Sequence, residues 1–533
     1  MEGLSKMLAK AKQMQWIEGF RVGNNEDKSI SVTHLLYADD TLTFCGTGKS
    51  EVRYLNLTLL LFEAISGLHI NMQKSKIYQV NEVPKLEEGI MDCSIDTFPT
   101  KYLGLPLGAK FKDAGVWNEV IEKMERRLAT WKMQYLSMGG RLTLINSVLD
   151  SIPTYIMSML PIPSKVQNQI DKIRRSFLWK GSYEGHKFHL VKWENVNMPK
   201  QHGGLGIRDL KKHNKSLLMK WWWRYAQEPT CIWKEVVNAK YGRQDKWNTK
   251  QNNDPYGVGP WKYINQLREE FFQEVSFRIG NGNSVKFWKD RWLNNQPFNV
   301  SHPAVYRIAS DTDSSVAQNR EGGIWAPRFR RNFQDWELNE LFDFLRILEG
   351  TSMTPHLPDS LKWGNSEKGI YTVKEGYHKL CSSNAMIDQW PWKLIWKTRL
   401  PPKIKCFTWT TLKNAILTLD NLNRRKLQLV NRCFMCLNSL ESVNHLFLHC
   451  PVATALWNMF ISIAGINWIL LQSIKEVIGS WSLREVDSPI KKTWQMIPSC
   501  IFWCIWKERN LRCFDGISTP ISSLKSFCVI SLF

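Results

Sequence analysis

The 533-residue sequence has few acidic residues and few cysteines, and both shortages exclude classes of protein. Asp and Glu total 49 against 71 Lys and Arg, so the formal net charge is 71 − 49 = +22. An excess of this sign indicates a polyanionic partner, first of all nucleic acid. Only 12 cysteines occur and no signal peptide opens the chain, which argues against a secreted disulfide scaffold.

The sequence also lacks internal repeats, low-complexity tracts and continuous apolar runs. Residues 450–474 carry no charge, but Pro451, Gly465 and Gln472 interrupt them, so we expect buried helices and no membrane span. Apolar residues make up 43% and charged residues 23%, values typical of folded proteins, which excludes wholesale disorder. The chain is long enough for several domains, each with its own core.

Tryptophan is abundant, with 26 residues, and the cysteines are concentrated after residue 400. We expect most tryptophans to be core, including the run Trp221-Trp222-Trp223, in which base stacking is the less favoured alternative. The cysteine distribution favours a reducing compartment, with thiols that are free or bound to metal. Cys500 and Cys504, one helical turn apart, are predicted to be core.

A pair of carboxylates is predicted at the tip of a β-hairpin. Residues 31–36 read as a strand entering Tyr37-Ala38-Asp39-Asp40, and residues 41–45 alternate as the return strand. Adjacent carboxylates at a hairpin tip can hold the divalent metal of nucleotidyl transfer. The alternative is ordinary turn chemistry, in which Asp residues simply favour the turn. A helix is predicted next, with an apolar stripe from Val52 to Ile65 and a cap at Gly67.

Two further motifs follow this hairpin, at residues 67–75 (Gly-Leu-His-Ile-Asn-Met-Gln-Lys-Ser) and 102–108 (Tyr-Leu-Gly-Leu-Pro-Leu-Gly). In order and spacing, the set resembles the palm of a non-LTR (LINE-type) retrotransposon reverse transcriptase, particularly the plant type. The resemblance implies catalytic roles for Tyr37, Asp39, Asp40 and Lys74, with Mg²⁺ at the two Asp residues and a primer-gripping hairpin at 102–108. Phrases at 131–141, 152–155, 177–181, 202–206 and 279–283 extend the likeness along most of the chain.

One departure from the family pattern bears on activity. The polymerase family needs another metal-binding Asp from an upstream strand, and the only acids before Tyr37 are Glu2, Glu18, Glu26 and Asp27. None of them has apolar strand neighbours. We therefore expect an N-terminally truncated reverse transcriptase that binds Mg²⁺ weakly and does not polymerise DNA as written. The alternative is a non-catalytic, zinc-containing nucleic-acid-binding protein of retrotransposon origin.

Residues 121–220 carry 18 Lys and Arg against 7 Asp and Glu. Residues 115–220 are predicted to be mainly helical, with breaks at Gly139-Gly140, at Pro153, at 161–163 and at Gly203-Gly204. By the resemblance this is a thumb-like segment, and its basic side chains can line a nucleic-acid backbone; a solvated helix face is the alternative. The predicted nucleic-acid-binding residues are Lys123, Arg126, Arg127, Lys132, Arg141, Lys172, Arg174 and Arg175. Residues 279–284 are rich in glycine but lack the Lys-Ser/Thr ending of a P-loop and its preceding strand and following helix. We therefore expect a tight hairpin turn there.

A zinc signature lies near the C-terminal end. Cys433-x2-Cys436 is followed by His445, His449 and Cys450, five candidates for four tetrahedral positions. On an ideal helix His445 and His449 share a face, whereas Pro451 takes Cys450 out of helical geometry and frees its sulfur. The surrounding residues resemble the zinc-binding domain that follows such reverse transcriptases. That resemblance implies structural Zn²⁺ on Cys433, Cys436, His445 and Cys450, with His449 as alternate; free buried thiols are the other reading.

The predicted fold class is α+β, with a partial reverse-transcriptase palm and a small, mainly helical zinc-binding domain. The predicted partner is an RNA or DNA template-primer or another nucleic acid, without a membrane. The resemblance alone implies the nucleus and cytoplasm. The predicted domains are a palm at 1–112, a basic helical thumb-like region at 113–230, a Trp-rich region at 231–385, the zinc-binding domain at 386–480 and a helical tail at 481–533.

Overall fold

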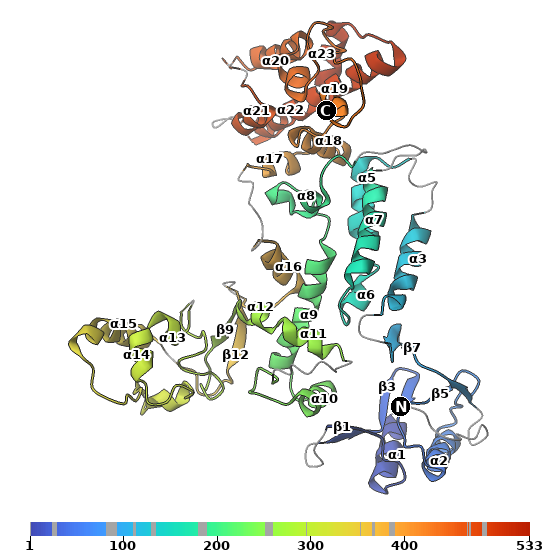
Figure 1. Cartoon of the computed structure of the whole chain (residues 1–533), viewed down its shortest axis with the longest axis vertical. Coiled ribbons are helices and arrows are strands. Elements are labelled where there is room, and N and C mark those ends of the chain that lie inside the picture. Colours follow the sequence, from blue (N-terminus) through green and yellow to red (C-terminus); the bar gives the residue numbers. More distant parts are fainter. Residues whose placement is uncertain are drawn as a thin grey trace. The chain divides into compact units, whose positions relative to one another are not determined.

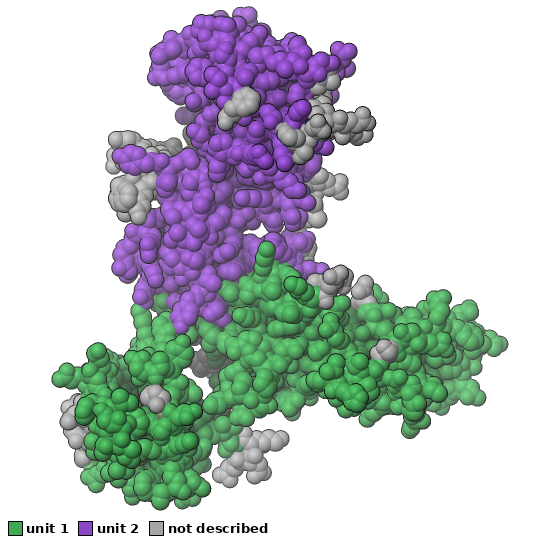
Figure 2. Space-filling model, turned by 180° about the vertical axis from the view of Figure 1, so that it is seen from behind, with its two compact units in different colours: residues 1–116, 159–161, 215–376 green, residues 117–158, 162–214, 377–533 purple. Residues whose placement is uncertain are grey.

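The structure, a computed structural model, combines helices with short β-strands (Figure 1), as the α+β class predicts. It describes the whole chain except residues 1, 24–28, 81–92, 110–112, 129–134, 180–188, 251–258, 295, 352, 365–367, 383–389, 466, 468, 470, 482–487 and 533. Two compact units are formed (Figure 2): unit 1 is Met1–Val116, Met159–Pro161 and Lys215–Gly376, and unit 2 is Trp117–Ser158, Ile162–Asn214 and Tyr377–Phe533. The division into five domains stays a prediction.

Unit 1 contains short helices and paired strands. Its helices are α1 (Glu2–Gln13), α2 (Lys49–Ser66), α10 (Ile232–Tyr241), α11 (Trp261–Gln266), α12 (Arg268–Phe272), α13 (Phe298–Ser301), α14 (Pro303–Ile308) and α15 (Leu338–Glu349). Its strands are β1 (Phe20–Val22), β2 (Ile30–Val32), β3 (His34–Tyr37), β4 (Asp40–Thr43), β5 (Lys76–Tyr78), β6 (Ser94–Asp96), β7 (Thr100–Tyr102), β8 (Leu105–Leu107), β9 (Val275–Arg278), β10 (Arg320–Glu321), β11 (Ile324–Trp325) and β12 (Ser360–Trp363). Within the described ranges every sheet has two strands, and only β5 and β6 pair in parallel.

Helices α1 and α2 form a small core at the start of unit 1 (Figure 1). Leu4, Leu8 and Ala11 of α1 are buried, as the helical spacing of apolar residues predicts. Gly67 ends α2 with a left-handed φ of 69°, and its N–H donates to Glu63 O at 2.9 Å, which is the predicted cap. Ile65, predicted on the buried stripe, is 77% exposed, because at about 100° per residue it lies roughly 80° around the helix from Leu55.

The turn at residues 279–284 differs from the hairpin that was predicted. In a tight hairpin, β9 would pair with the residues directly after the turn. Instead β9 pairs antiparallel with β12, some eighty residues later in the chain. The Asp359 carboxylate, just before β12, accepts the backbone N–H groups of Gly280, Gly282 and Ser284 at 2.8, 2.8 and 2.9 Å. A long-range carboxylate therefore organises this loop, where the sequence indicated local turn chemistry.

Aromatic side chains fill the interior of unit 1. Trp222 is fully buried, and its Nε1–H donates to Ile264 O at 2.8 Å. Further along the chain, the rings of Trp288 and Phe344 stack, with centroids 5.4 Å apart and an interplanar angle of 8°. Burying a Trp removes a large apolar area from water, and a bonded Nε1 avoids the cost of an unpaired buried donor. Trp222 of the triple-Trp run is therefore core, as predicted.

Unit 2 is almost entirely helical. Its helices are α3 (Asn118–Arg127), α5 (Met138–Leu144), α6 (Thr154–Met157), α7 (Ser164–Trp179), α8 (Trp193–Asn197), α17 (Lys393–Trp396), α18 (Pro402–Leu412), α19 (Leu419–Arg424), α20 (Pro451–Ile463), α21 (Ile474–Ser480), α22 (Ser488–Asn510) and α23 (Ile521–Ile530). The chain passes between the units within α9 (Leu210–Gln227) and α16 (Val373–Ser382). None of the helices in the described part is long and apolar enough to cross a membrane.

The helix break predicted at Gly139-Gly140 falls just before them, at the non-helical Leu136 and Ser137, and the two glycines lie in the first turn of α5. Glycine at position 139 therefore has another reason. The reason is packing against α18. A Cβ placed on Gly139 would lie 2.6 Å from Pro402 Cβ and 2.9 Å from Lys403 N. No side chain fits in that space, so Gly139 permits the close approach of the two helices. The cost of a glycine inside a helix is offset by this contact.

Candidate metal centre

The predicted carboxylate pair lies at a β-hairpin. Strands β3 and β4 are antiparallel, with Tyr37 opposite Asp40, and Ala38 at the tip has a left-handed φ of 52°. Tyr37, Asp39 and Asp40 are exposed. Burial, with the Asp40 charge adding to it, raises the pKa of Tyr102 at the end of β7, so this predicted primer-gripping hairpin lies near Asp40. The pairing of β3 with β4 shows that the hairpin predicted around Tyr37-Ala38-Asp39-Asp40 forms.

A third carboxylate does not join this pair among the residues that the structure describes. Glu2 is exposed in the first turn of α1, and Glu18 bonds Arg21 at 3.3 Å. Glu26 and Asp27 lie outside the described residues. Lys74 is exposed, and its backbone N–H donates to Asn71 Oδ1 at 3.0 Å. Mg²⁺ prefers six oxygen ligands, so two exposed carboxylates alone make a weak site.

Four of the eight predicted nucleic-acid-binding residues are exposed on the surface of unit 2. Lys123, Arg126 and Arg127 are exposed on α3, and Lys172 is exposed on α7. Half-buried Arg141 donates from Nε to Leu136 O at 3.0 Å, which holds its head against the backbone. Lys132 lies outside the described residues.

Arg174 was predicted to contact nucleic acid, and the structure shows that this is wrong. Its side chain is fully buried, with Nη1 2.7 Å from Asp150 Oδ1 and Nη2 bonded to Asp171. Nη1 also donates to Arg208 O at 2.9 Å. A guanidinium paired with two carboxylates in the interior cannot reach a phosphate, so Arg174 holds α7 to the residues around Asp150. The adjacent Arg175 is half-buried, and its guanidinium lies 5.6 Å from the ring centre of Trp193.

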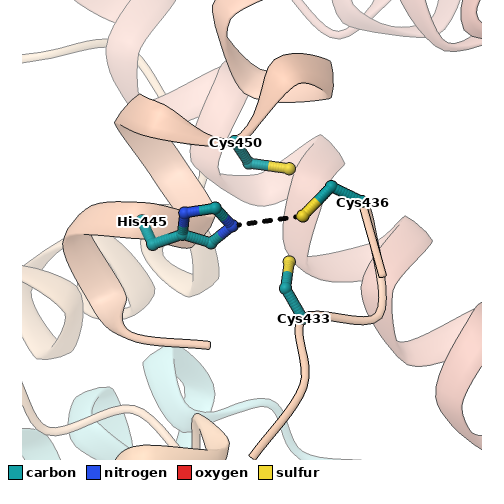
Figure 3. Close-up of side chains that lie close together, drawn as sticks. All are labelled: Cys433, Cys436, His445 and Cys450. Atoms are coloured by element: carbon teal, nitrogen blue, oxygen red, sulfur yellow. Dashed lines mark hydrogen bonds between the residues drawn. The ribbon is translucent and has the colours of Figure 1, made fainter. Parts of the chain in front are cut away.

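The four predicted zinc ligands come together in unit 2 (Figure 3). The Sγ atoms of Cys433, Cys436 and Cys450 and a ring nitrogen of His445 all lie within 4.8 Å of one another. Cys436 Sγ and His445 Nε2 are 3.4 Å apart. Tetrahedral zinc at about 2.0–2.3 Å from each ligand requires ligand separations of about 3.3–3.8 Å, so a small contraction fits the group to the ion. Cys433 and Cys450 are fully buried, which closes the site.

Local backbone geometry presents the two knuckle cysteines. The N–H of Cys433 donates to Ser439 O, and the N–H of Leu437 returns to Cys433 O, both at 2.8 Å. Leu437 has a left-handed φ of 59°, which turns the chain back immediately after Cys436. This tight loop directs both thiols to one side, as Figure 3 shows.

His445 and Cys450 come from the two ends of one helical turn. His445 begins the π-helical turn η7 (His445–His449), and Cys450 follows with an extended ψ of 135° before Pro451 at the first position of α20. This is the predicted effect of Pro451 on the preceding residue. His449 lies outside the group: it is exposed, with Nε2 3.4 Å from Gln472 O.

Electrostatics favour the metal-ligating form of two of the ligands, Cys450 and His445, and oppose it at Cys433. The hydrogen bond from Cys433 lowers the pKa of the Cys450 thiol, assisted by the backbone N–H groups of Val452 and Ala453 at the start of α20. The same bond, together with burial, raises the pKa of Cys433. Burial lowers the pKa of His445, which keeps the imidazole neutral as a ligand requires. Thiolate and neutral imidazole form the soft donor set that selects zinc.

A buried ion pair that sequence reasoning missed supports the metal loop. Arg509 at the end of α22 donates to Glu441 Oε1 from Nη2 at 2.8 Å and to Oε2 from Nε at 3.2 Å. Glu441 also accepts the N–H of Leu419 at 3.0 Å, and Arg512 donates to Met435 O at 3.0 Å. Glu441 is the only charged residue in the sequence between Cys433 and Cys450, a signal that could have identified it. These bonds fasten α22 and the π-helical turn that follows it, Leu511–Asp515, to the loop that carries the ligands.

Comparisons with known proteins agree with this geometry. Residues 371–457, which contain all four ligands, match a family model described as zinc-binding in reverse transcriptase. The chain is 28% identical over 449 residues to a protein of Arabidopsis thaliana named "Putative ribonuclease H protein", covering 78% of this chain and 68% of that protein. It is 26% identical over 147 residues to an uncharacterised mitochondrial protein of the same plant, covering 27% of this chain and 93% of the relative.

A third relative is the uncharacterised 149 kDa protein of transposon TX1 of Xenopus laevis, 26% identical over 236 residues. The match covers 41% of this chain and 17% of that protein. Together the comparisons and the Cys₃His group support a retrotransposon-related protein with a zinc-binding domain.

Proposed function

We propose that the chain belongs to a plant LINE-type retrotransposon reverse transcriptase and contributes zinc-stabilised nucleic-acid binding. The observation that carries the proposal is the buried Cys₃His group inside the region that matches the reverse-transcriptase zinc-binding family. A closed four-ligand site is structural, because no position is left open for a substrate. Its binding energy, on the order of 10–16 kcal/mol in zinc-finger peptides, would stabilise the fold around it.

The net charge of +22 and the exposed cations of α3 and α7 support nucleic acid as the partner. Each phosphate contacted on duplex DNA adds about 0.9 to the slope of log affinity against log salt concentration. We propose Lys123, Arg126, Arg127 and Lys172 as part of this contact surface. By the same resemblance, we propose that the protein is made in the cytoplasm and acts in the nucleus.

We further propose that the 533-residue polypeptide does not polymerise DNA by itself. The support is the weak metal site of two exposed carboxylates, which lacks a third acidic partner among the described residues. In this proposal Mg²⁺ binds Asp39 and Asp40 only weakly. A non-catalytic nucleic-acid-binding protein of retrotransposon origin is the second candidate, and it shares the zinc and binding properties.

Two measurements on the purified full chain test the proposal. Elemental analysis should find one zinc per chain, and fluorescence anisotropy should report RNA and DNA binding that weakens steeply with salt. A chain without zinc, or without affinity for either nucleic acid at low salt, would refute it. Extension of oligo(dT) on poly(rA) with Mg²⁺ or Mn²⁺ should be absent, and template-dependent extension would refute the claim of inactivity.

A further inference from the structure

Unit 2 contains a cleft of about 440 Å³, and none of the four Cys₃His residues lines it. Its walls come from the turn at Lys200–His202, from α16 and α17, and from Asn146 and Asn197. The volume lies in the range of pockets that enclose small organic ligands. Asn146 lies in the π-helical turn Ile145–Leu149, a rare backbone form that is frequent at functional sites.

The cleft is positively charged, and none of its lining residues in the described part of the chain is acidic. Lys200, Lys393 and Lys397 line it, and all three are exposed. Behind them, Lys405 donates to Trp396 O at 3.4 Å, and burial together with the Lys200 charge lowers the pKa of Lys405. None of these four lysines forms an ion pair with a carboxylate in the described part of the chain. Like charges gathered without a counter-ion repel one another, and a bound anion would relieve that repulsion.

The cleft also has an aromatic surface and unpaired polar atoms. The half-buried ring of Trp396 lines it, with Lys200 Nζ 5.1 Å from the ring centre. Three buried atoms of lining residues lack a hydrogen-bond partner in the described structure: Asn146 Oδ1, Asn197 Oδ1 and Trp396 Nε1. Unpaired buried polar atoms are costly, and a ligand that bonds them would recover that cost.

We propose that this cleft binds one nucleotide of a single-stranded nucleic acid, with its phosphates against Lys200, Lys393 and Lys397 and its base on Trp396. An aromatic ring beside cations is the arrangement that binds single strands. Base stacking on an aromatic ring is stronger than an exposed cation–π contact, so a base can replace Lys200 on the ring while the ammonium turns to the phosphate. Asn146 and Asn197 line the same cleft, and a turn of either side chain would bring its amide to the base edge.

This inference rests on the proposed nucleic-acid binding and assigns it a specific location. Anisotropy titrations of the zinc-loaded full chain would use a labelled ten-nucleotide oligo(dT), an abasic oligomer of equal length, and inorganic phosphate as competitor. The wild type should bind oligo(dT) about tenfold more tightly than the abasic strand. Trp396→Leu should abolish that preference, and Trp396→Phe should keep most of it. Millimolar phosphate should not displace oligo(dT).

The lysines are tested by the double variant Lys393→Ala/Lys397→Ala. It should weaken both oligomers and reduce the salt slope by about 1.4, because each phosphate contact on a single strand adds about 0.7. The matched control is Lys165→Ala/Lys507→Ala, which removes the same charge from exposed positions of unit 2 outside the cleft. The control should keep the base preference and the slope.

Each result separates this inference from the proposed function. A wild type that binds no oligomer would refute both. Binding by the wild type that is reduced equally by the cleft variant and the control variant would refute the cleft alone. A base preference that survives Trp396→Leu in a chain with an unchanged circular dichroism spectrum would refute the stacking role. Displacement of oligo(dT) by phosphate would mean that the cleft binds a free anion.

Discussion

Replacing Arg509 by Met should destabilise unit 2 by about 3–5 kcal/mol, because the change leaves a buried carboxylate without its partner. Glu441 is 0% exposed and Arg509 3% exposed, and two hydrogen bonds of 2.8 and 3.2 Å join them. After the substitution the N–H of Leu419, at 3.0 Å, is the remaining donor to the Glu441 carboxylate among the described residues. The methylene groups of Met keep most of the packing, so the lost interaction is mainly that of the ion pair.

Urea unfolding of the zinc-saturated full chain, followed by tryptophan fluorescence and far-UV circular dichroism, measures this loss. The double-mutant cycle with Glu441→Gln should give a coupling energy of at least about 1 kcal/mol, since the two residues share one buried pair. Zinc release to a chromogenic chelator should also accelerate in Arg509→Met, because Arg509 fastens α22 to Glu441 in the metal loop.

The matched control is Arg424→Met, in the same unit. Its partner Asp420 lies 3.5 Å away, but the Arg424 side chain is 65% exposed, so the loss should be at most about 0.5 kcal/mol. If Arg509→Met costs no more than this control, or if the coupling with Glu441→Gln is near zero, the buried pair does not support the metal loop and the reasoning fails.

Three further predictions concern other parts of the fold. Cys450→Ser should reduce the zinc content well below one per chain, whereas His449→Ala should leave it at one, as elemental analysis would record; equal losses would assign His449 to the site. Asp359→Ala should cost about 2–4 kcal/mol in urea unfolding, because three N–H donors lose one buried acceptor, and Asp359→Asn should cost less; a neutral Asp359→Ala would contradict this. Burial lowers the pKa of His213 to about 4, so the unfolded chain takes up a proton that the folded chain does not, and stability should fall as the pH decreases from about 6.5 to about 4. His213→Gln should flatten that part of the pH profile, and an unchanged slope would show that other groups cause it.

The parts of the structure that the sequence predicts are those specified by neighbouring residues. The hairpin at residues 34–43 follows from a period of two on either side of a turn, and the zinc loop follows from closely spaced thiols and imidazole. Pro451 acts on the residue directly before it, so the extended backbone of Cys450 could be foreseen.

The parts that the sequence does not predict depend on residues distant along the chain. Arg174 is indistinguishable in sequence from the basic residues around it, and its burial depends on Asp150, twenty-four residues earlier. In the sequence Gly139 indicates a helix break. Its close contact with Pro402, which lies far along the chain, explains why glycine is needed there. Strand β9 is ambiguous because its partner β12 lies beyond several other elements. Tertiary contacts overrode local preference in all three cases.

The contact between Gly139 and Pro402 has a consequence for synthesis on the ribosome. Unit 2 contains Ile162–Asn214 and resumes at Tyr377, after an interval of 376 − 214 = 162 residues. At about 5–20 residues per second, translation of that interval takes about 8–32 s, far longer than helix formation. Throughout that time the α5 face that receives Pro402 has no partner. A chaperone that shields apolar surface should therefore be retained longest on nascent chains that end between residues 214 and 402.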